Sequence, residues 1–212
     1  MKARKDLLDI ESLSNEEIEL VLTNAKPFKD LIRRSVKKVP PLRGRHVLTL
    51  FYEPSTRTRS SFEIAAKRLS ADVTNFTVST SSVVKGETII DTIDTLQAMQ
   101  VDYIIVRHSA AGVPNLIAKH TRASVINAGD GHHAHPTQGL LDAFTMKEVL
   151  GPLTGKRVAI VGDIQHSRVA RSTSMILRKL GAEVGVFGPG PLIPDDRHAD
   201  MQSFRTFDDV FD

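Results

Sequence analysis

From Val47 to Arg59 the chain reads VLTLFYEPSTRTR, an apolar run that leads directly into a segment rich in hydroxyls and arginines. The apolar run predicts a buried strand, which Pro54 is suited to end. Ser55 or Thr56 can then cap a helix, whose first-turn amides have no intrahelical partners. We therefore predict a helix packed on a sheet, with an anion-binding cradle at the helix N-terminus.

The two arginines of this segment are not equivalent. Arg57 supplies a planar fork that matches phosphate oxygens, next to three hydroxyl groups and the positive end of the helix dipole. Arg59 lies two positions further on, about 200° away around a helix, so only one of the two arginines is expected to face the anion. An ordinary polar helix start, with Ser60 and Glu63 forming a capping box, remains open on local grounds.

Apolar runs and helical patterns alternate along most of the chain. We expect strands at residues 47–51, 73–78, 103–106, 125–126, 158–161 and 184–187. We expect helices at residues 14–25, 55–70, 87–99, 116–120, 136–150 and 167–180. This alternation predicts an α/β protein with two doubly wound parallel-sheet domains, at residues 1–150 and 151–212. The second domain holds too few elements for a full core, so we expect it to be incomplete and the chain to be a fragment.

Composition excludes several function classes. The 212 residues carry a net charge of +3 and no cysteine, which excludes disulfides, thiolate metal sites and cysteine nucleophiles. The basic stretch from Arg33 to Arg45 has no interleaved aromatic residues, so we interpret it as a solvated loop and expect no nucleic-acid partner. No run of about 18 apolar residues occurs, which predicts a cytoplasmic protein with no membrane partner.

Two further cations stand at positions where ligands bind in α/β proteins. Lys85 precedes a predicted helix in a loop of hydroxyl residues, where it is either a ligand for an anion or a solvated loop lysine. Arg107 ends a predicted strand, and the carboxyl ends of parallel strands form the ligand crevice of an α/β sheet. A cation at a strand end is also common, so both interpretations of Arg107 stay open on local grounds.

His132, His133 and His135 crowd one loop, a pattern that first suggests a metal site. We expect no metal there, because the spacing matches no zinc-binding helix and three imidazoles on one tight loop do not easily converge. One histidine at the start of the helix after Pro136 is instead expected to point into the crevice, with Gln138 beside it as an amide donor or acceptor.

The segment from Gly162 to Arg168 again follows a strand and opens a helix, which predicts a second anion site faced by Arg168. It lacks the second and third glycines of a dinucleotide fingerprint, and a purely structural turn remains open. Asp163, His166 and Ser167 are the ingredients of a hydrolase triad, but adjacent positions in one turn do not meet the geometry that a triad requires.

Together these motifs resemble the family of aspartate carbamoyltransferase catalytic chains, and the resemblance covers essentially the whole chain. The motifs occur in the family's order: Phe51 to Arg59, Lys85-Gly86-Glu87, Asn127 to Gly131, His135 to Gln138 and Gly162-Asp163. Ornithine carbamoyltransferases share the Ser-Thr-Arg-Thr-Arg element but typically have Cys where this chain has Thr137. Aspartate is therefore the favoured acceptor, with an ornithine-type or other carbamoyltransferase as the alternative.

The resemblance implies transfer of the carbamoyl group from carbamoyl phosphate to the amino group of L-aspartate, as a step of pyrimidine synthesis. It implies no metal and no organic cofactor. The first domain would bind carbamoyl phosphate, and the second would be a partial aspartate-binding domain. Since that domain continues well beyond residue 212 in the family, a module that binds carbamoyl phosphate without turnover is the second functional hypothesis.

The resemblance also implies roles for the residues of the first domain. Ser55, Thr56, Arg57 and Thr58 would hold the phosphate, and Arg107 would bridge the phosphate and the carbonyl oxygen. Thr58 would also polarise that carbonyl oxygen. Arg57, Thr58 and Arg107 are thus implied to be catalytic as well as substrate-binding.

Five further residues complete the implied site. His135 would be the fourth catalytic residue, acting on the carbonyl oxygen, and Gln138 would hold the carbamoyl amino group. Arg168 would bind a carboxylate of aspartate. Ser81 and Lys85 would enter a neighbouring subunit's site, which implies a homotrimer, to which regulatory or dihydroorotase-like chains can attach.

Overall fold

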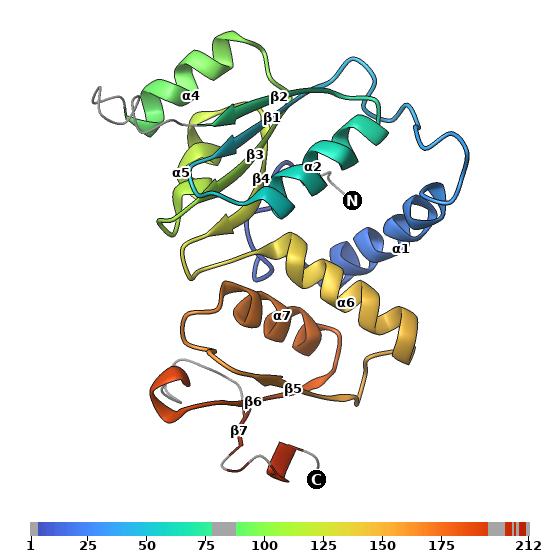
Figure 1. The fold of residues 1–212 in the computed structure, drawn as a ribbon, viewed down its shortest axis with the longest axis vertical. Coiled ribbons are helices and arrows are strands. Elements are labelled where there is room, and N and C mark those ends of the chain that lie inside the picture. The colour runs from blue at the N-terminus through green and yellow to red at the C-terminus, as the bar shows by residue number, and fades with distance from the viewer. Residues whose placement is uncertain (1–3, 78–87, 195–201, 205, 207, 211–212) are drawn as a thin grey trace. The chain divides into compact units, whose positions relative to one another are not determined.

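The structure, a computed structural model, describes residues 4–77, 88–194, 202–204, 206 and 208–210. By its packing the chain forms two compact units (Figure 1). The first comprises Met1–Leu8 and Thr23–Gly131, and the second comprises Asp9–Leu22 and His132–Asp212. Each unit contains a parallel sheet and helices, so the predicted α/β class is confirmed.

The sheet of the first unit has the strand order β2-β1-β3-β4, with all neighbours parallel. Its strands are β1 (His46–Phe51), β2 (Asp72–Thr77), β3 (Tyr103–His108) and β4 (Ser124–Asp130). Its helices are α2 (Thr56–Arg68), α4 (Ile89–Ala98) and α5 (Val113–His120). Because β2 and β3 lie on opposite sides of β1, the strand order reverses between β1 and β3, which is where α/β sheets bind ligands.

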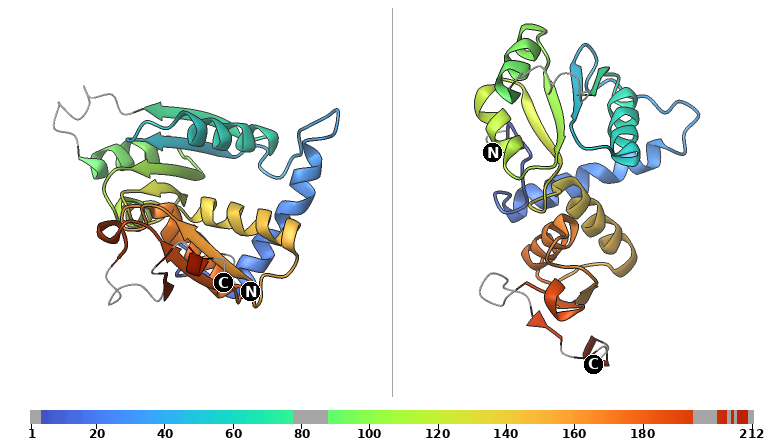
Figure 2. Two further views of the ribbon diagram at one scale, coloured as in Figure 1. Left: turned by 60° about the horizontal axis from the view of Figure 1, so that its bottom comes forward. Right: turned by 60° about the vertical axis from the view of Figure 1, so that its left-hand side comes forward.

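Helices cover both faces of this sheet, as a doubly wound fold requires. Leu48 and Leu50 of β1 pack in one apolar cluster with residues of α4 and α5. Val47 and Phe51 pack in another cluster with Ala66 of α2. The right-hand view of Figure 2 shows α2 on one face of the sheet and α4 and α5 on the other. The alternation of side chains along β1 therefore explains why its sequence is apolar almost throughout.

Replacing Leu50 with alanine should lower the free energy of unfolding by about 2–5 kcal/mol, because Leu50 is fully buried and its removal leaves a cavity. Urea denaturation followed by circular dichroism measures this change. Ile64 of α2 is 48 % exposed and serves as the control, since Ile64→Ala should cost less than about 1 kcal/mol. Equal losses at the two positions would contradict the placement of β1 in the core.

The second unit contains a parallel sheet of order β5-β6-β7 and two long helices that pack on each other. Its elements are α6 (Pro136–Leu150), β5 (Arg157–Val161), α7 (Arg168–Lys179), β6 (Glu183–Phe187) and β7 (Gln202–Ser203), with short 3-10 turns at Gly190–Leu192 and Asp208–Val210. Leu177 of α7 packs with Val184 of β6 and with Leu153 in its core. At Gly139 of α6 an added Cβ would lie 3.0 Å from the backbone oxygen of Ser172, so a glycine permits the close packing of α6 on α7.

Helix α1 (Asn15–Leu31) begins after the predicted capping box. The amide of Ser14 donates to Glu17 Oε2 (2.9 Å), and the amide of Glu17 donates to Ser14 Oγ (3.2 Å). The helix extends further than the predicted residues 14–25 and contains Pro27 in its interior. No helix among the described residues is both long enough and apolar enough to cross a membrane.

The two units do not divide the chain at residue 150. Packing places the division between Gly131 and His132, because α6 packs against α7 and belongs with the second unit. The predicted boundary rested on Gly151-Pro152, which follow the end of α6. The assignment of residues 1–150 and 151–212 to two functional domains stays a prediction.

Candidate functional site

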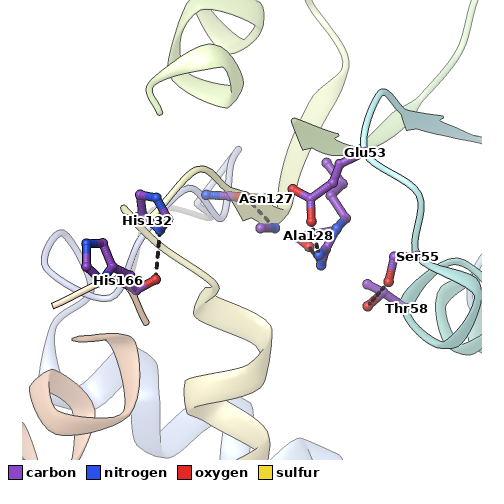
Figure 3. A network of polar contacts seen from close by, with 9 residues as sticks. Glu53, Ser55, Thr58, Asn127, Ala128, His132 and His166 are labelled. Atoms are coloured by element: carbon purple, nitrogen blue, oxygen red, sulfur yellow. Dashed lines mark hydrogen bonds and ion pairs between the residues drawn. The ribbon is translucent and has the colours of Figure 1, made fainter. Parts of the chain in front are cut away.

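The turn between β1 and α2 is built as the sequence indicated, with one difference. Ser55 is the N-cap residue of α2, but its side chain accepts no capping hydrogen bond. Instead Ser55 Oγ donates to Thr58 Oγ1 at 2.9 Å (Figure 3). The first intrahelical bond runs from the amide of Arg59 to the carbonyl of Ser55. The backbone amides of residues 56–58, before Arg59, therefore have no intrahelical partner. They form a helix N-terminus without a side-chain cap, flanked by hydroxyls, which suits an anion.

The alternative capping box of Ser60 and Glu63 is wrong. Helix α2 already begins at Thr56, and the carboxylate of Glu63 accepts from Lys67 Nζ (2.6 Å) and from Asn75 Nδ2 (3.0 Å). Those two bonds lower the pKa of Glu63 below its usual value. Asn75 belongs to β2, so one of the two groups that bind the carboxylate of Glu63 comes from outside the helix.

The two arginines of the turn have different surroundings. Arg57 is exposed in the first turn of α2. Arg59 is partly buried, and its charge adds a smaller electrostatic contribution that also lowers the pKa of Glu63. Arg59 therefore belongs to the surface network of α2, and Arg57 remains the candidate anion ligand.

Arg107 lies beside this turn because β1 and β3 are neighbours. It pairs with Phe51 in the register of the two strands, and its carbonyl accepts from the amide of Tyr52 at 2.9 Å. The guanidinium, only 11 % exposed, forms an ion pair with Glu53 and donates to the carbonyl of Ala128 at 3.3 Å (Figure 3). Its Nε is buried without a hydrogen-bond partner among the described residues. Arg107 is thus held in a fixed position with one donor unused.

The Asn127 to Gly131 motif explains why Ala128 presents its carbonyl to Arg107. The register of β3 and β4 shifts after Val106, so that β4 contains a bulge at this level. Asn127 is fully buried and donates to Asp130 Oδ1 at 2.8 Å, while its Oδ1 accepts from the amide of Gly129 at 2.8 Å. These bonds fix the end of β4, which is a structural role that sequence reasoning did not assign.

The second unit holds another pair of predicted residues, at the start of α6. His135 is the N-cap residue of that helix and is 7 % exposed. Its amide donates to Ser172 Oγ of α7 at 2.9 Å, and its Nδ1 lies 3.3 Å from Thr137 Oγ1. Gln138, which follows Thr137, donates from Nε2 to Asp142 Oδ1 at 2.8 Å. Both side chains are therefore fixed by contacts within the second unit.

The histidine-rich loop spreads its side chains. His132 Nδ1 lies 2.7 Å from the carbonyl oxygen of His166, and the two imidazoles pack edge to face with centroids 5.4 Å apart (Figure 3). His135 instead lies at the start of α6. Within the described ranges, no group of three or more histidine, aspartate or glutamate side chains is arranged to hold a metal ion.

The turn before α7 is stabilised by its own side chains. Ser167 caps the helix by accepting from the amide of Ala170 at 3.1 Å. Asp163 accepts from the amide of His166 at 3.1 Å, and this bond is the main reason why the pKa of Asp163 is lowered. Arg168 is the first residue of α7 and is partly exposed. The structural interpretation of Asp163 and Ser167 is therefore confirmed, while the role of Arg168 stays a prediction.

The predicted site residues thus fall into three sets: residues of the first unit, residues of the second unit, and residues outside the described ranges. Ser55, Thr56, Arg57, Thr58 and Arg107 gather at the carboxyl ends of β1 and β3 in the first unit, and His135, Gln138 and Arg168 belong to the second unit. Ser81 and Lys85 lie outside the described residues. Sequence reasoning missed Glu53 and Asp142. Asp142 follows Gln138 by one helical turn, a spacing that could have revealed it.

Fold and site together define a parallel α/β protein that gathers hydroxyl and guanidinium groups at its topological switch point. Residues 5–148 match the family model described as aspartate/ornithine carbamoyltransferase, carbamoyl-P binding domain. The chain belongs to this family of carbamoyltransferases.

Relatives with curated names agree with this assignment. The chain is 65 % identical over 208 residues to the aspartate carbamoyltransferase catalytic subunit of Akkermansia muciniphila, covering 98 % of this chain and 67 % of the relative. It is 60 % identical over 192 residues to that of Endomicrobium trichonymphae, covering 91 % and 62 %. The chain therefore spans only about two thirds of the length of these relatives.

Solved structures show the same fold. Aspartate transcarbamoylase from Trypanosoma cruzi in complex with carbamoyl phosphate and aspartate matches with a TM-score of 0.84 and 31 % identity, over 95 % of this chain and 67 % of that one. The catalytic subunit of M. jannaschii aspartate transcarbamoylase matches with a TM-score of 0.83 and 36 % identity, over 97 % and 70 %.

Proposed function

We propose that this protein binds carbamoyl phosphate and transfers its carbamoyl group to the amino group of L-aspartate, giving N-carbamoyl-L-aspartate and phosphate. The observation that carries the proposal is the uncapped start of α2 beside the largely buried guanidinium of Arg107, at the switch point of the first sheet. Backbone amides, hydroxyls and an arginine fork are the donors that a phosphate group requires. The carbamoyl group and the aspartate acceptor are proposed because a relative is named as an aspartate carbamoyltransferase and a similar solved structure contains carbamoyl phosphate and aspartate.

The proposed reaction needs few catalytic side chains. The neutral amine attacks the carbonyl carbon, a C–N bond forms, the bond from carbon to the phosphate oxygen breaks, and negative charge develops on the carbonyl oxygen. Fixed donors stabilise that charge more than they stabilise the ground state, and Arg107, Thr58 and His135 are proposed for this role. The departing phosphate is basic enough to accept the amine proton.

The remaining substrate contacts and the assembly are also proposals. Gln138 is proposed to hold the carbamoyl amino group and Arg168 a carboxylate of aspartate. A cytoplasmic homotrimer in which Ser81 and Lys85 enter a neighbouring site is proposed from the family resemblance, and light scattering after gel filtration measures its mass. Attached regulatory or dihydroorotase-like chains stay a prediction.

Product assays with carbamoyl phosphate and either aspartate or ornithine test the proposed acceptor. We expect carbamoyl aspartate and no citrulline, because Thr137 stands where ornithine enzymes typically have Cys. Turnover of ornithine alone would refute the choice of acceptor. Calorimetric binding of carbamoyl phosphate with no product from either amine would instead support a binding module.

A further inference from the structure

Asp142 links the two long helices of the second unit through its carboxylate. Its Oδ1 accepts from Gln138 Nε2 at 2.8 Å, one turn earlier on α6, and its Oδ2 accepts from Thr173 Oγ1 of α7 at 2.6 Å. Thr173 is 6 % exposed, so this second anchor is buried. Asp142 and Thr173 also line a cavity of about 330 Å³.

The start of α6 is held to α7 at a second level. The amide of His135 donates to Ser172 Oγ at 2.9 Å, and Gly139 packs directly against the backbone of Ser172. Since Ser172 and Thr173 are consecutive residues of α7, one short stretch of that helix positions both His135 and, through Asp142, Gln138. The side chain of Gln138 therefore projects from a helix turn whose backbone is fixed.

The carboxylate determines which end of the Gln138 amide is available to a ligand. An ionised carboxylate only accepts hydrogen bonds, so the atom that faces Asp142 must be the amide nitrogen. The carbonyl oxygen Oε1 is then left as an acceptor. Without Asp142 the amide could turn over at little steric cost, because its oxygen and nitrogen ends are nearly alike in shape.

We propose that Asp142 is a positioning residue that fixes Gln138 as a hydrogen-bond acceptor and thereby selects a carbamoyl group over acyl groups that lack N–H donors. This inference rests on the proposed function of Gln138. A carbamoyl amino group only donates, so it requires an acceptor, and a methyl group in its place leaves that acceptor unpaired. A site built around such a hydrogen bond rejects an analogue that lacks the donor.

Calorimetry with three ligands tests the inference: carbamoyl phosphate, acetyl phosphate, in which a methyl replaces the amino group, and inorganic phosphate. Native protein should prefer carbamoyl phosphate to acetyl phosphate. Asp142→Ala should reduce that preference about tenfold or more while leaving the affinity for inorganic phosphate within about twofold. Asp142→Asn should restore most of the preference, because its Oδ1 can still accept from Gln138 while the Thr173 hydroxyl turns to accept from its Nδ2.

Two controls separate positioning from a general loss of structure. Asp94 on α4 is exposed and also accepts from a glutamine amide, that of Gln97 at 3.3 Å, so Asp94→Ala makes the same change elsewhere and should leave the preference intact. The double variant Gln138→Ala/Asp142→Ala should lose no more than Gln138→Ala alone, because the two residues act as one unit.

The results of these measurements test the role of Asp142 separately from the proposed function on which it rests. A native protein that binds neither acyl phosphate would overturn the proposed function, and one that binds the two equally would overturn the role of Gln138 and with it this inference. A native preference that survives in Asp142→Ala would overturn the role of Asp142 alone. If Asp142→Ala does not fold, Thr173→Val replaces it, and retention of the full preference there refutes the inference, because Thr173 holds the carboxylate in place.

Discussion

Arg57→Ala should weaken the binding of inorganic phosphate by about 10- to 100-fold, whereas Arg59→Ala should change it by less than about threefold. Arg57 is exposed in the first turn of α2, next to amides that the Ser55 side chain does not cap. Loss of its guanidinium removes charge-assisted hydrogen bonds to the anion while the helix dipole and the amides remain. Isothermal titration calorimetry of both variants measures the difference.

Arg59→Ala is a matched control because it removes the same group two positions further along the same helix. Arg59 contributes to the electrostatic environment of Glu63, whose carboxylate is also bound to Lys67 and Asn75. Its loss should therefore affect the surface of α2 and not the ligand. Equal losses of affinity would show that the two arginines do not face in different directions, and would remove the basis for assigning the phosphate to Arg57.

Local sequence patterns were sufficient to predict most of the fold. The apolar run before Pro54 predicts β1 because each of its faces meets a helix, and the hydroxyl and arginine segment predicts the start of α2. Arg107 could be placed at a strand end for the same reason. Its neighbours in the sheet could not be predicted, because strand order and register depend on the packing of segments far apart in the sequence.

Non-local contacts account for what the sequence did not reveal. The rival capping box at Glu63 is absent partly because Asn75 of β2 binds that carboxylate. The carbonyl of Ala128 reaches Arg107 because β4 contains a bulge, which no local sequence pattern predicts. Asp142 was overlooked although its spacing from Gln138 is regular, since its significance depends on Thr173, which belongs to another helix.

Arg107→Ala should lower kcat for carbamoyl aspartate formation by about 10²- to 10³-fold, the usual cost of losing one fixed donor to a developing oxyanion. Glu53 and the carbonyl of Ala128 hold the guanidinium in place, so in this protein the donor is oriented before the substrate arrives. A donor fixed in advance costs no reorganisation during the reaction. Steady-state assays at saturating aspartate measure kcat, and circular dichroism confirms the fold of the variant.

Arg107→Lys separates charge from geometry at the same position. An ammonium restores the positive charge but cannot form the planar fork that contacts Glu53 and Ala128 together. The variant should recover part of the affinity for phosphate, while kcat stays about tenfold or more below that of the native protein. If Arg107→Lys were fully active, charge alone would suffice, and the bulge in β4 would have no role in catalysis. If Arg107→Ala also kept its kcat within about threefold, Arg107 would be only the structural partner of Glu53.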